Sequence, residues 1–238
     1  LSNDCFRLTA ATPSQTGAVW ANTPLNLNAP FDLKGQIFLG CSDAGADGLA
    51  FVLQTGGTGI IGVGGGSVGY GGILNSVAVE FDTWANTAAQ PPNLSDPTFD
   101  HLARVSGGVL DHAAATNLAG PVGILPGNAN AEDCQYHDVR FTWDPTANVF
   151  EVYVDCQLRL TYNGDIRAAL GGSTSATYGY TAATGGAANQ HEACFLSNSQ
   201  PGSNTALTLC QGDTLTLTAG PGTDHSWSPG AGLSAPLG

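Results

Sequence analysis

Short runs in which apolar and polar residues alternate recur along the whole chain. Residues 31–39, 137–144 and 149–155 have the two-residue period of half-buried strands, and the turn at 145–148 joins the last two as a hairpin. Further strands are expected at 2–11, 17–20, 46–53 and 157–162, and residues 166–170 predict a short turn or helix. No stretch of useful length has helical periodicity, so the pattern predicts an all-β protein.

The strand that begins at Val77 carries the densest group of potential ligands. Residues two apart in a strand share a face, so Glu80 and Asp82 project together, on the side opposite their apolar neighbours. A loop rich in proline and asparagine follows, with Asn86, Asp96 and an imidazole at His101. These five side chains are expected to converge at one end of the strand.

Two kinds of cation suit this set. Calcium prefers carboxylate, amide and carbonyl oxygens, whereas an imidazole among carboxylates suits manganese or another transition ion. Asp82 and Asp96 could bridge both ions, because each carboxylate has two oxygens. An acidic surface strand followed by a solvated loop is the plain alternative.

The run EFDTWAN at 80–86, followed by DPTFDH at 96–101, resembles the metal-binding segment of the legume, or L-type, lectins. The resemblance implies a concanavalin A-like jelly-roll β-sandwich that binds calcium and manganese. It assigns calcium to Asp82, the carbonyl of Trp84, Asn86 and Asp96, and the transition ion to Glu80, Asp82, Asp96 and His101. Ten positions separate Asn86 from Asp96, more than in plant members, so Asn93 or Asp100 could replace one of these ligands.

Two further segments resemble sugar-site loops of the same family. In ADGLAFVL at 46–53, the resemblance implies that Asp47 follows a cis peptide bond and accepts hydrogen bonds from sugar hydroxyls. Residues 65–70, GGSVGY, resemble a glycine-rich sugar-site segment of the family, and the resemblance implies that Gly66 donates its backbone N–H to the sugar. A side chain at that position would block the close approach. Asn86 would donate through its amide, and the indole of Trp84 would pack against the sugar ring.

Residues 178–192 resemble the last sugar-site loop and the final strand of the family. The resemblance places Gly186 and Ala187 at the loop tip, where backbone N–H groups contact the ligand. Their small size predicts an open end of the pocket.

Composition limits the partners. The net charge is −13 although only 11% of residues are charged, and the six Lys and Arg residues do not cluster, which argues against nucleic acid or anionic membrane as a partner. No apolar run approaches the ~20 residues of a membrane span, and we expect any secretion signal to be already absent from this chain. Glycans or glycoconjugates, further domains of a longer chain and other copies of this chain are the expected partners.

Six cysteines without a CxxC pair favour disulfides in an oxidising compartment, and therefore an extracellular or cell-surface protein. The predicted hairpin would pair Cys134 with Cys156, and a second pairing would join Cys5 to Cys41. Cys194 and Cys210 stay unassigned.

The chain is expected to hold one domain and part of another. Residues 1–196 would form the lectin-like domain and residues 197–205 a linker, whereas residues 206–238 resemble the first strands of an immunoglobulin-like or PKD-like repeat.

Binding without catalysis is the function that these features predict, and two alternatives remain. One is a metal-stiffened spacer or filament subunit of a surface assembly. The other is a glycoside hydrolase, since enzymes of similar fold carry E-x-D-x-x-E, two glutamates that flank an aspartate. Ala85 takes the position of the second glutamate here, which argues against hydrolysis.

Overall fold

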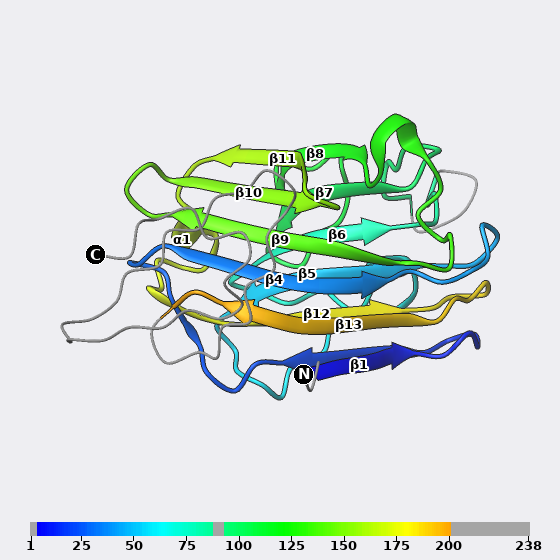
Figure 1. Ribbon diagram of the computed structural model, residues 1–238, viewed down its shortest axis with the longest axis horizontal. Coiled ribbons are helices and arrows are strands. Elements are labelled where there is room, and N and C mark those ends of the chain that lie inside the picture. The colour runs from blue at the N-terminus through cyan, green and yellow to red at the C-terminus, as the bar shows by residue number, and fades with distance from the viewer. Residues whose placement is uncertain (1–3, 88–92, 201–238) are drawn as a thin grey trace, which may run out of the picture. The chain divides into compact units, whose positions relative to one another are not determined.

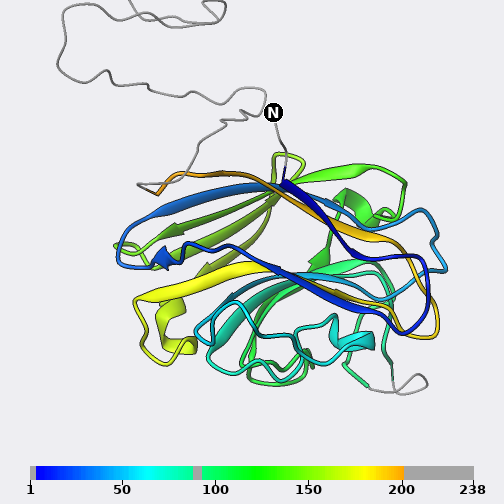
Figure 2. The same ribbon diagram turned by 90° about the horizontal axis from the view of Figure 1, so that it is seen from below.

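Two antiparallel sheets form the part of the chain that the computed structural model describes, residues 4–87 and 93–200. One sheet has six strands in the order β1-β13-β4-β9-β10-β11. The other has seven strands in the order β2-β12-β5-β6-β7-β8, with β3 paired to β12. Figures 1 and 2 show the sheets stacked face to face, so the predicted all-β jelly-roll sandwich is confirmed.

The strands of the six-stranded sheet are β1 (Asp4–Thr9), β4 (Phe31–Phe38), β9 (Tyr136–Asp144), β10 (Val149–Val154), β11 (Gln157–Asn163) and β13 (His191–Asn198). Those of the seven-stranded sheet are β2 (Thr16–Trp20), β3 (Leu25–Asn26), β5 (Gly48–Gln54), β6 (Ser76–Asp82), β7 (His101–Ser106), β8 (Asn117–Gly123) and β12 (Ser175–Ala183). Three short helical turns complete the described elements: η1 (Gly65–Ser67), η2 (Pro126–Asn128) and α1 (Ile166–Ala169).

Burial explains why these runs form strands. Along β4, every second side chain is buried between the sheets, and the intervening ones are partly exposed. Every residue of β5 and β6 is buried, since their outer face is covered as well. Residues of the glycine-rich segment after β5, among them Val68, Tyr70 and Ile73, form a second apolar cluster on that outer face. Figure 2 shows this segment below the seven-stranded sheet.

The structure pairs four of the cysteines differently from the prediction. Cys5 on β1 is bonded to Cys194 on β13, where the two residues are direct partners in the ladder, and Cys41 is bonded to Cys134. The pairings Cys134–Cys156 and Cys5–Cys41 were therefore wrong.

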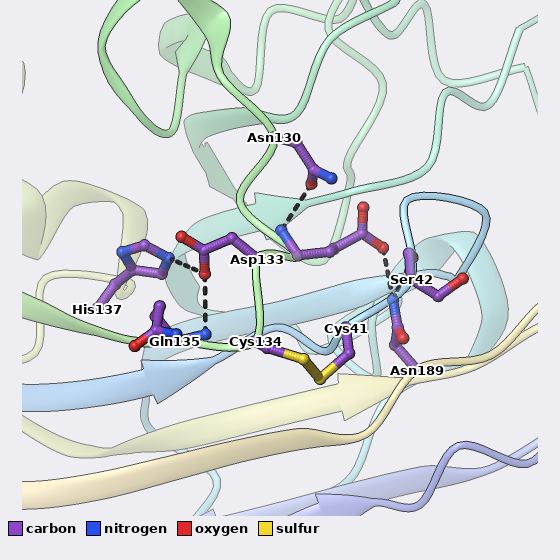
Figure 3. Close-up of a disulfide and its surroundings, with 9 residues drawn as sticks. Cys41, Ser42, Asn130, Asp133, Cys134, Gln135, His137 and Asn189 are labelled. Carbon is purple, nitrogen blue, oxygen red and sulfur yellow. Dashed lines mark hydrogen bonds and ion pairs between the residues drawn. A yellow bond between two sulfur atoms is a disulfide. The ribbon is translucent and has the colours of Figure 1, made fainter.

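Strand register explains the error. The hairpin pairs Val154 with Val139, so Cys134 lies beyond the region opposite Cys156. β4 and β9 pair Phe38 with Tyr136, and the continuation of that register brings Cys41 beside Cys134. Figure 3 shows this bond near the ends of the two strands.

The predicted first domain ends at residue 196, and the structure describes the chain as far as residue 200. β13 continues to Asn198, and the Gln200 side chain still donates to the Asn26 carbonyl, 2.7 Å away. The proposed repeat at 206–238 and most of the proposed linker at 197–205 lie outside the described residues. No helix in the described part of the chain is long and apolar enough to cross a membrane.

Candidate functional site

Three neighbouring strands bring the predicted ligands together. Antiparallel pairing sets Asp82, at the end of β6, opposite Gly48 on β5 and His101 on β7. Val79 and Phe81 face the core between the sheets, so Glu80 and Asp82 project from the outer face of the seven-stranded sheet, as the alternation predicts. All three ligand side chains, at positions 80, 82 and 101, are almost fully buried.

The loop after β6 folds back over these side chains. The Trp84 N–H donates to Asp82 Oδ1 and the Asn86 N–H to Asp96 Oδ2, both at 2.7 Å. The insertion before Asp96 therefore does not move this carboxylate away from the strand. Ligand atoms of Asp82, Asp96 and His101 lie within 4.8 Å of one another, as a shared cation requires.

His112 completes a second group that the sequence did not indicate. Its Nε2 atom lies 3.3 Å from Glu80 Oε1, 3.4 Å from Asp96 Oδ1 and 2.8 Å from His101 Nε2. The residue comes from the loop between β7 and β8, in an alanine-rich stretch without a recognisable motif. Only the fold places it here.

The two alternative ligands do not join these groups. The side-chain oxygen of Asn93 accepts the Ser95 N–H, and Asp100 Oδ2 accepts the Ala131 N–H. The Asn93 interaction is local, whereas Asp100 is held against the segment before β9, 31 residues further along the chain, so both side chains have partners outside the two groups.

Burial sets the electrostatics of the site. It raises the pKa of Glu80 and Asp82 well above the usual values, and the negative charge of Asp96 raises both further. Burial also raises the pKa of Asp96 to about 6 and lowers the pKa of His101 to about 3, with a further lowering from His112. These shifts all disfavour the charged forms relative to water, whereas a divalent cation would favour the carboxylates.

The residues fit the metals that the fold family implies. Within the described part of the chain, no hydrogen-bond donor reaches Glu80 Oε1 or the side-chain oxygen of Asn86, although both atoms are buried. Buried oxygens without donors are costly unless a cation or water satisfies them. Carboxylate and amide oxygens next to imidazole nitrogens are a donor set for such a cation.

Asp47 lies beside this centre. Its peptide bond to Ala46 is cis, as the resemblance implies. The Asp47 N–H donates to the Ala183 carbonyl, and the Asp47 carbonyl accepts the Thr83 N–H, each at 3.0 Å, so the residue is held between β12 and the end of β6. Its side chain is buried, burial raises its pKa to about 6, and Oδ2 meets no donor from the described residues.

Two glycines enclose this region. A Cβ atom built on Gly66 would lie 2.7 Å from Cγ of Asn86, so only glycine allows this approach. A Cβ on Gly185 would lie 3.0 Å from Asp47 Oδ2, which places the loop after β12 next to that carboxylate. Gly186 is exposed at the loop tip, Ala187 is half-buried, and Trp84 is half-buried at the start of the metal loop.

Asn189 holds the loop that carries Asp47 in place through hydrogen bonds. The Asn189 N–H donates to the Ala46 carbonyl at 3.0 Å, and its side-chain nitrogen donates to the Ser42 carbonyl at 2.8 Å and to Glu132 Oε1 at 2.5 Å. Figure 3 shows Asn189 and Ser42 near the Cys41–Cys134 disulfide. Sequence reasoning missed this support, which has no local motif.

Comparison with known proteins agrees with the fold. The model of the legume lectin beta-barrel domain matches residues 2–197. Lectin I-B4 from Griffonia simplicifolia, in a metal-free form, has a TM-score of 0.64 at 20% identity, over 80% of this chain and 85% of that chain. Peanut lectin with a nonapeptide has the same TM-score and identity, over 87% and 89%.

A bacterial protein is also similar in sequence. The serine-rich adhesin for platelets of Staphylococcus aureus strain USA300 is 27% identical over 216 residues, which cover 82% of this chain. The match spans only 9% of the adhesin's length. Because the family model covers most of the chain, from residue 2 to residue 197, the chain belongs to the legume lectin beta-barrel domain family.

Proposed function

We propose that this chain binds glycans at a pocket ordered by calcium and a transition ion, as an adhesive module of a larger extracellular protein. The observation that carries this proposal is the contact between the two halves of the site. The Asn86 N–H donates a hydrogen bond to Asp96 in the metal loop, and the Asn86 side chain also lies against Gly66 in the sugar-site loop. A cation that fixes the conformation of the metal loop would therefore also fix the position of Asn86 next to Gly66.

The metal ligands follow from the groups described above. Asp82, the Trp84 carbonyl, Asn86 and Asp96 would hold calcium, and Glu80, Asp82, Asp96 and His101 would hold a transition ion such as manganese. Both ions would supply positive charge that neutralises the buried carboxylates and fixes the loop. The metals would order the chain, and the sugar contacts would come from protein groups alone.

The sugar contacts come from the chain itself. Asp47 would accept hydrogen bonds from two hydroxyls, and the Asn86 amide and the Gly66 N–H would donate to the same ring. Trp84 would cover an apolar face of the sugar, and Gly186 and Ala187 would border the open end of the pocket. The buried Oδ2 of Asp47, which meets no donor among the described residues, supports this acceptor role.

Single-site affinity should be weak. A sugar gains about 1 kcal/mol for each hydrogen bond, and a few such bonds correspond to a dissociation constant of roughly 0.1–1 mM. Adhesion at this affinity needs several copies of the module. The similarity to an adhesin supports this arrangement, and the two disulfides support an oxidising, extracellular setting.

A glycan array probed with the chain in calcium and manganese tests the proposal. We expect the chain to bind glycans, EDTA to abolish this binding, and calcium with manganese to restore it. The Asp47→Asn variant should stay folded but bind glycans much more weakly. Galactose, N-acetylgalactosamine and fucose are suitable first probes, because related lectin structures hold them.

The array also separates glycan binding from the spacer alternative. If the folded, metal-loaded chain binds no glycan while EDTA lowers its melting temperature, the ions only stabilise a spacer. Release of reducing sugar from a β-glucan would instead support hydrolysis, which the half-buried Ala85 in place of a second glutamate disfavours.

A further inference from the structure

His112 faces the same point as the predicted transition-ion ligands. Its Nε2 atom is within 3.4 Å of Glu80 Oε1, Asp96 Oδ1 and His101 Nε2. Its side chain is only 4% exposed. Four potential donor atoms from three separate segments therefore surround one position.

The separations match the coordination shell of a small divalent ion. Metal–ligand bonds of about 2.1 Å place neighbouring octahedral ligands roughly 3.0 Å apart and opposite ones roughly 4.2 Å apart. The distances from His112 Nε2, at 2.8, 3.3 and 3.4 Å, are near the first value. The 4.0 Å between His101 Nε2 and Asp96 Oδ1 is near the second.

The backbone fixes His112 in this position. Its N–H donates to the Leu94 carbonyl at 2.9 Å, and its carbonyl accepts the Asn117 side-chain N–H at 3.1 Å. The Leu94 N–H donates in turn to the Asn86 carbonyl at 2.9 Å. The loop that carries His112 is thus joined by hydrogen bonds to the metal loop.

An ordinary core histidine would have both ring nitrogens satisfied by the protein. Nδ1 of His112 is buried and has no hydrogen-bond partner within the described ranges. Nε2 is within hydrogen-bond distance of His101 Nε2 and also faces two carboxylate oxygens, and three potential ligands around one nitrogen are typical of a metal ligand rather than of structural packing.

We propose that His112 is a second imidazole ligand, so that the transition-ion site would hold Glu80, Asp82, Asp96, His101 and His112 and would favour zinc, cobalt and nickel over manganese more strongly than a site with one imidazole. The proposal rests on the proposed function, in which this site binds a metal. Imidazole suits zinc, nickel and copper, whereas carboxylates and water suit manganese. A second nitrogen in place of a water or an oxygen therefore shifts the preference towards the later ions.

Metal competition measures this preference. The metal-free full chain, kept in excess calcium, would be titrated with Zn²⁺, Co²⁺, Ni²⁺ and Mn²⁺ against a chromophoric chelator. Because manganese is generally the weakest binder of this series, the ratio of zinc to manganese affinity is compared between the unmodified chain and a variant without His112, and we expect it to fall on removal of His112. Since loss of even an outer partner of a ligand costs about 10–100-fold in affinity, His112→Leu should weaken zinc at least about 10-fold and manganese much less.

Pulsed EPR of the Cu²⁺-loaded protein counts the bound imidazoles directly. The unmodified chain should show two, and His112→Leu and His112→Gln should each show one. His137→Gln is the matched control, because His137 is also buried but interacts with Asp133 and Asp155 outside the site. If leucine prevents folding, the glutamine variant and the count in the unmodified chain still decide the question.

The outcomes separate this inference from the proposed function. One imidazole in the unmodified chain, or equal zinc affinity with and without His112, overturns the second ligand but leaves metal-dependent glycan binding intact. A chain that binds no transition ion in excess calcium overturns both.

Discussion

The carboxyl group of Glu132 gives a quantitative test of the electrostatics behind the sugar-site loop. The residue is 2% exposed, and Oε1 accepts the hydrogen bond from Asn189. Burial, and next the negative charge of Asp100, raise the pKa of Glu132 to about 8. We predict that Glu132→Gln stabilises the protein near neutral pH, since glutamine keeps the acceptor and cannot ionise.

The sign and size follow from proton linkage. The folded pKa of Glu132 lies above its unfolded value of 4.5, so the folded state holds the proton more tightly. This contribution to stability is complete below pH 4.5 and is lost as the pH rises through about 8. Between pH 4.5 and pH 7 the free energy of unfolding therefore falls by about 3 kcal/mol, since each of the 2.5 pH units corresponds to 1.36 kcal/mol. Because the surrounding loop can relax and admit water, we expect Glu132→Gln to raise the free energy of unfolding at pH 7 by about 1–3 kcal/mol.

Urea unfolding at pH 4.5, 7 and 8.5, with both metals present, measures the effect. The variant should exceed the original protein in free energy of unfolding at pH 7 and match it at pH 4.5. Glu151→Gln, on β10, controls for a glutamate-to-glutamine change away from this loop, where the side chain accepts a hydrogen bond from Tyr153. A variant that is less stable at pH 7, or a difference that is the same at every pH, would refute the reasoning. Glycan affinity should stay unchanged, because Asn189 keeps its partner.

Three further predictions concern the metals, the sugar pocket and the second disulfide. EDTA should lower the melting temperature by several degrees in calorimetry, since an ion at 100 times its dissociation constant contributes about 2.7 kcal/mol; an unchanged melting temperature would contradict a metal-ordered loop. Gly66→Ala should reduce glycan affinity at least about 10-fold in titration calorimetry, because its Cβ would collide with Asn86, whereas the control Gly59→Ala, with no atom within 4 Å of the new Cβ, should have no effect. Replacement of Cys41 and Cys134 by serine should cost about 2–4 kcal/mol in urea unfolding, and equal stability would show that the strand ends hold without the bond.

The sandwich and the placement of the acidic side chains of β6 could be predicted because their signals are local. Alternation along β4, β9 and β10 reports directly which face of each strand is buried. The same period places Glu80 and Asp82 on one face. The pairing of β6 with β7 then needs only the sequential order of the strands to set Asp82 opposite His101. The sugar-site residues, by contrast, came from resemblance and not from the pattern.

The disulfides could not be predicted because they depend on pairing between distant strands. β1 pairs with β13 across most of the domain, and β4 pairs with β9, which is about a hundred residues away. The hairpin of β9 and β10 was correct, yet it did not determine the partner of Cys134. Local geometry shows which cysteines are near in the chain, whereas sheet order decides which are near in space.

The position of His112 depends on two irregular features at once. The pairing of β7 with β8 shifts register on both sides of Arg104, and the loop between these strands turns back towards β6. Leu94 then fixes that loop through the His112 N–H, although Leu94 itself belongs to the inserted metal loop. An insertion between Asn86 and Asp96 and an imidazole beyond β7 are therefore parts of one arrangement. A change in the length of either loop should move the His112 imidazole away from Glu80 and Asp96, even where every carboxylate is kept.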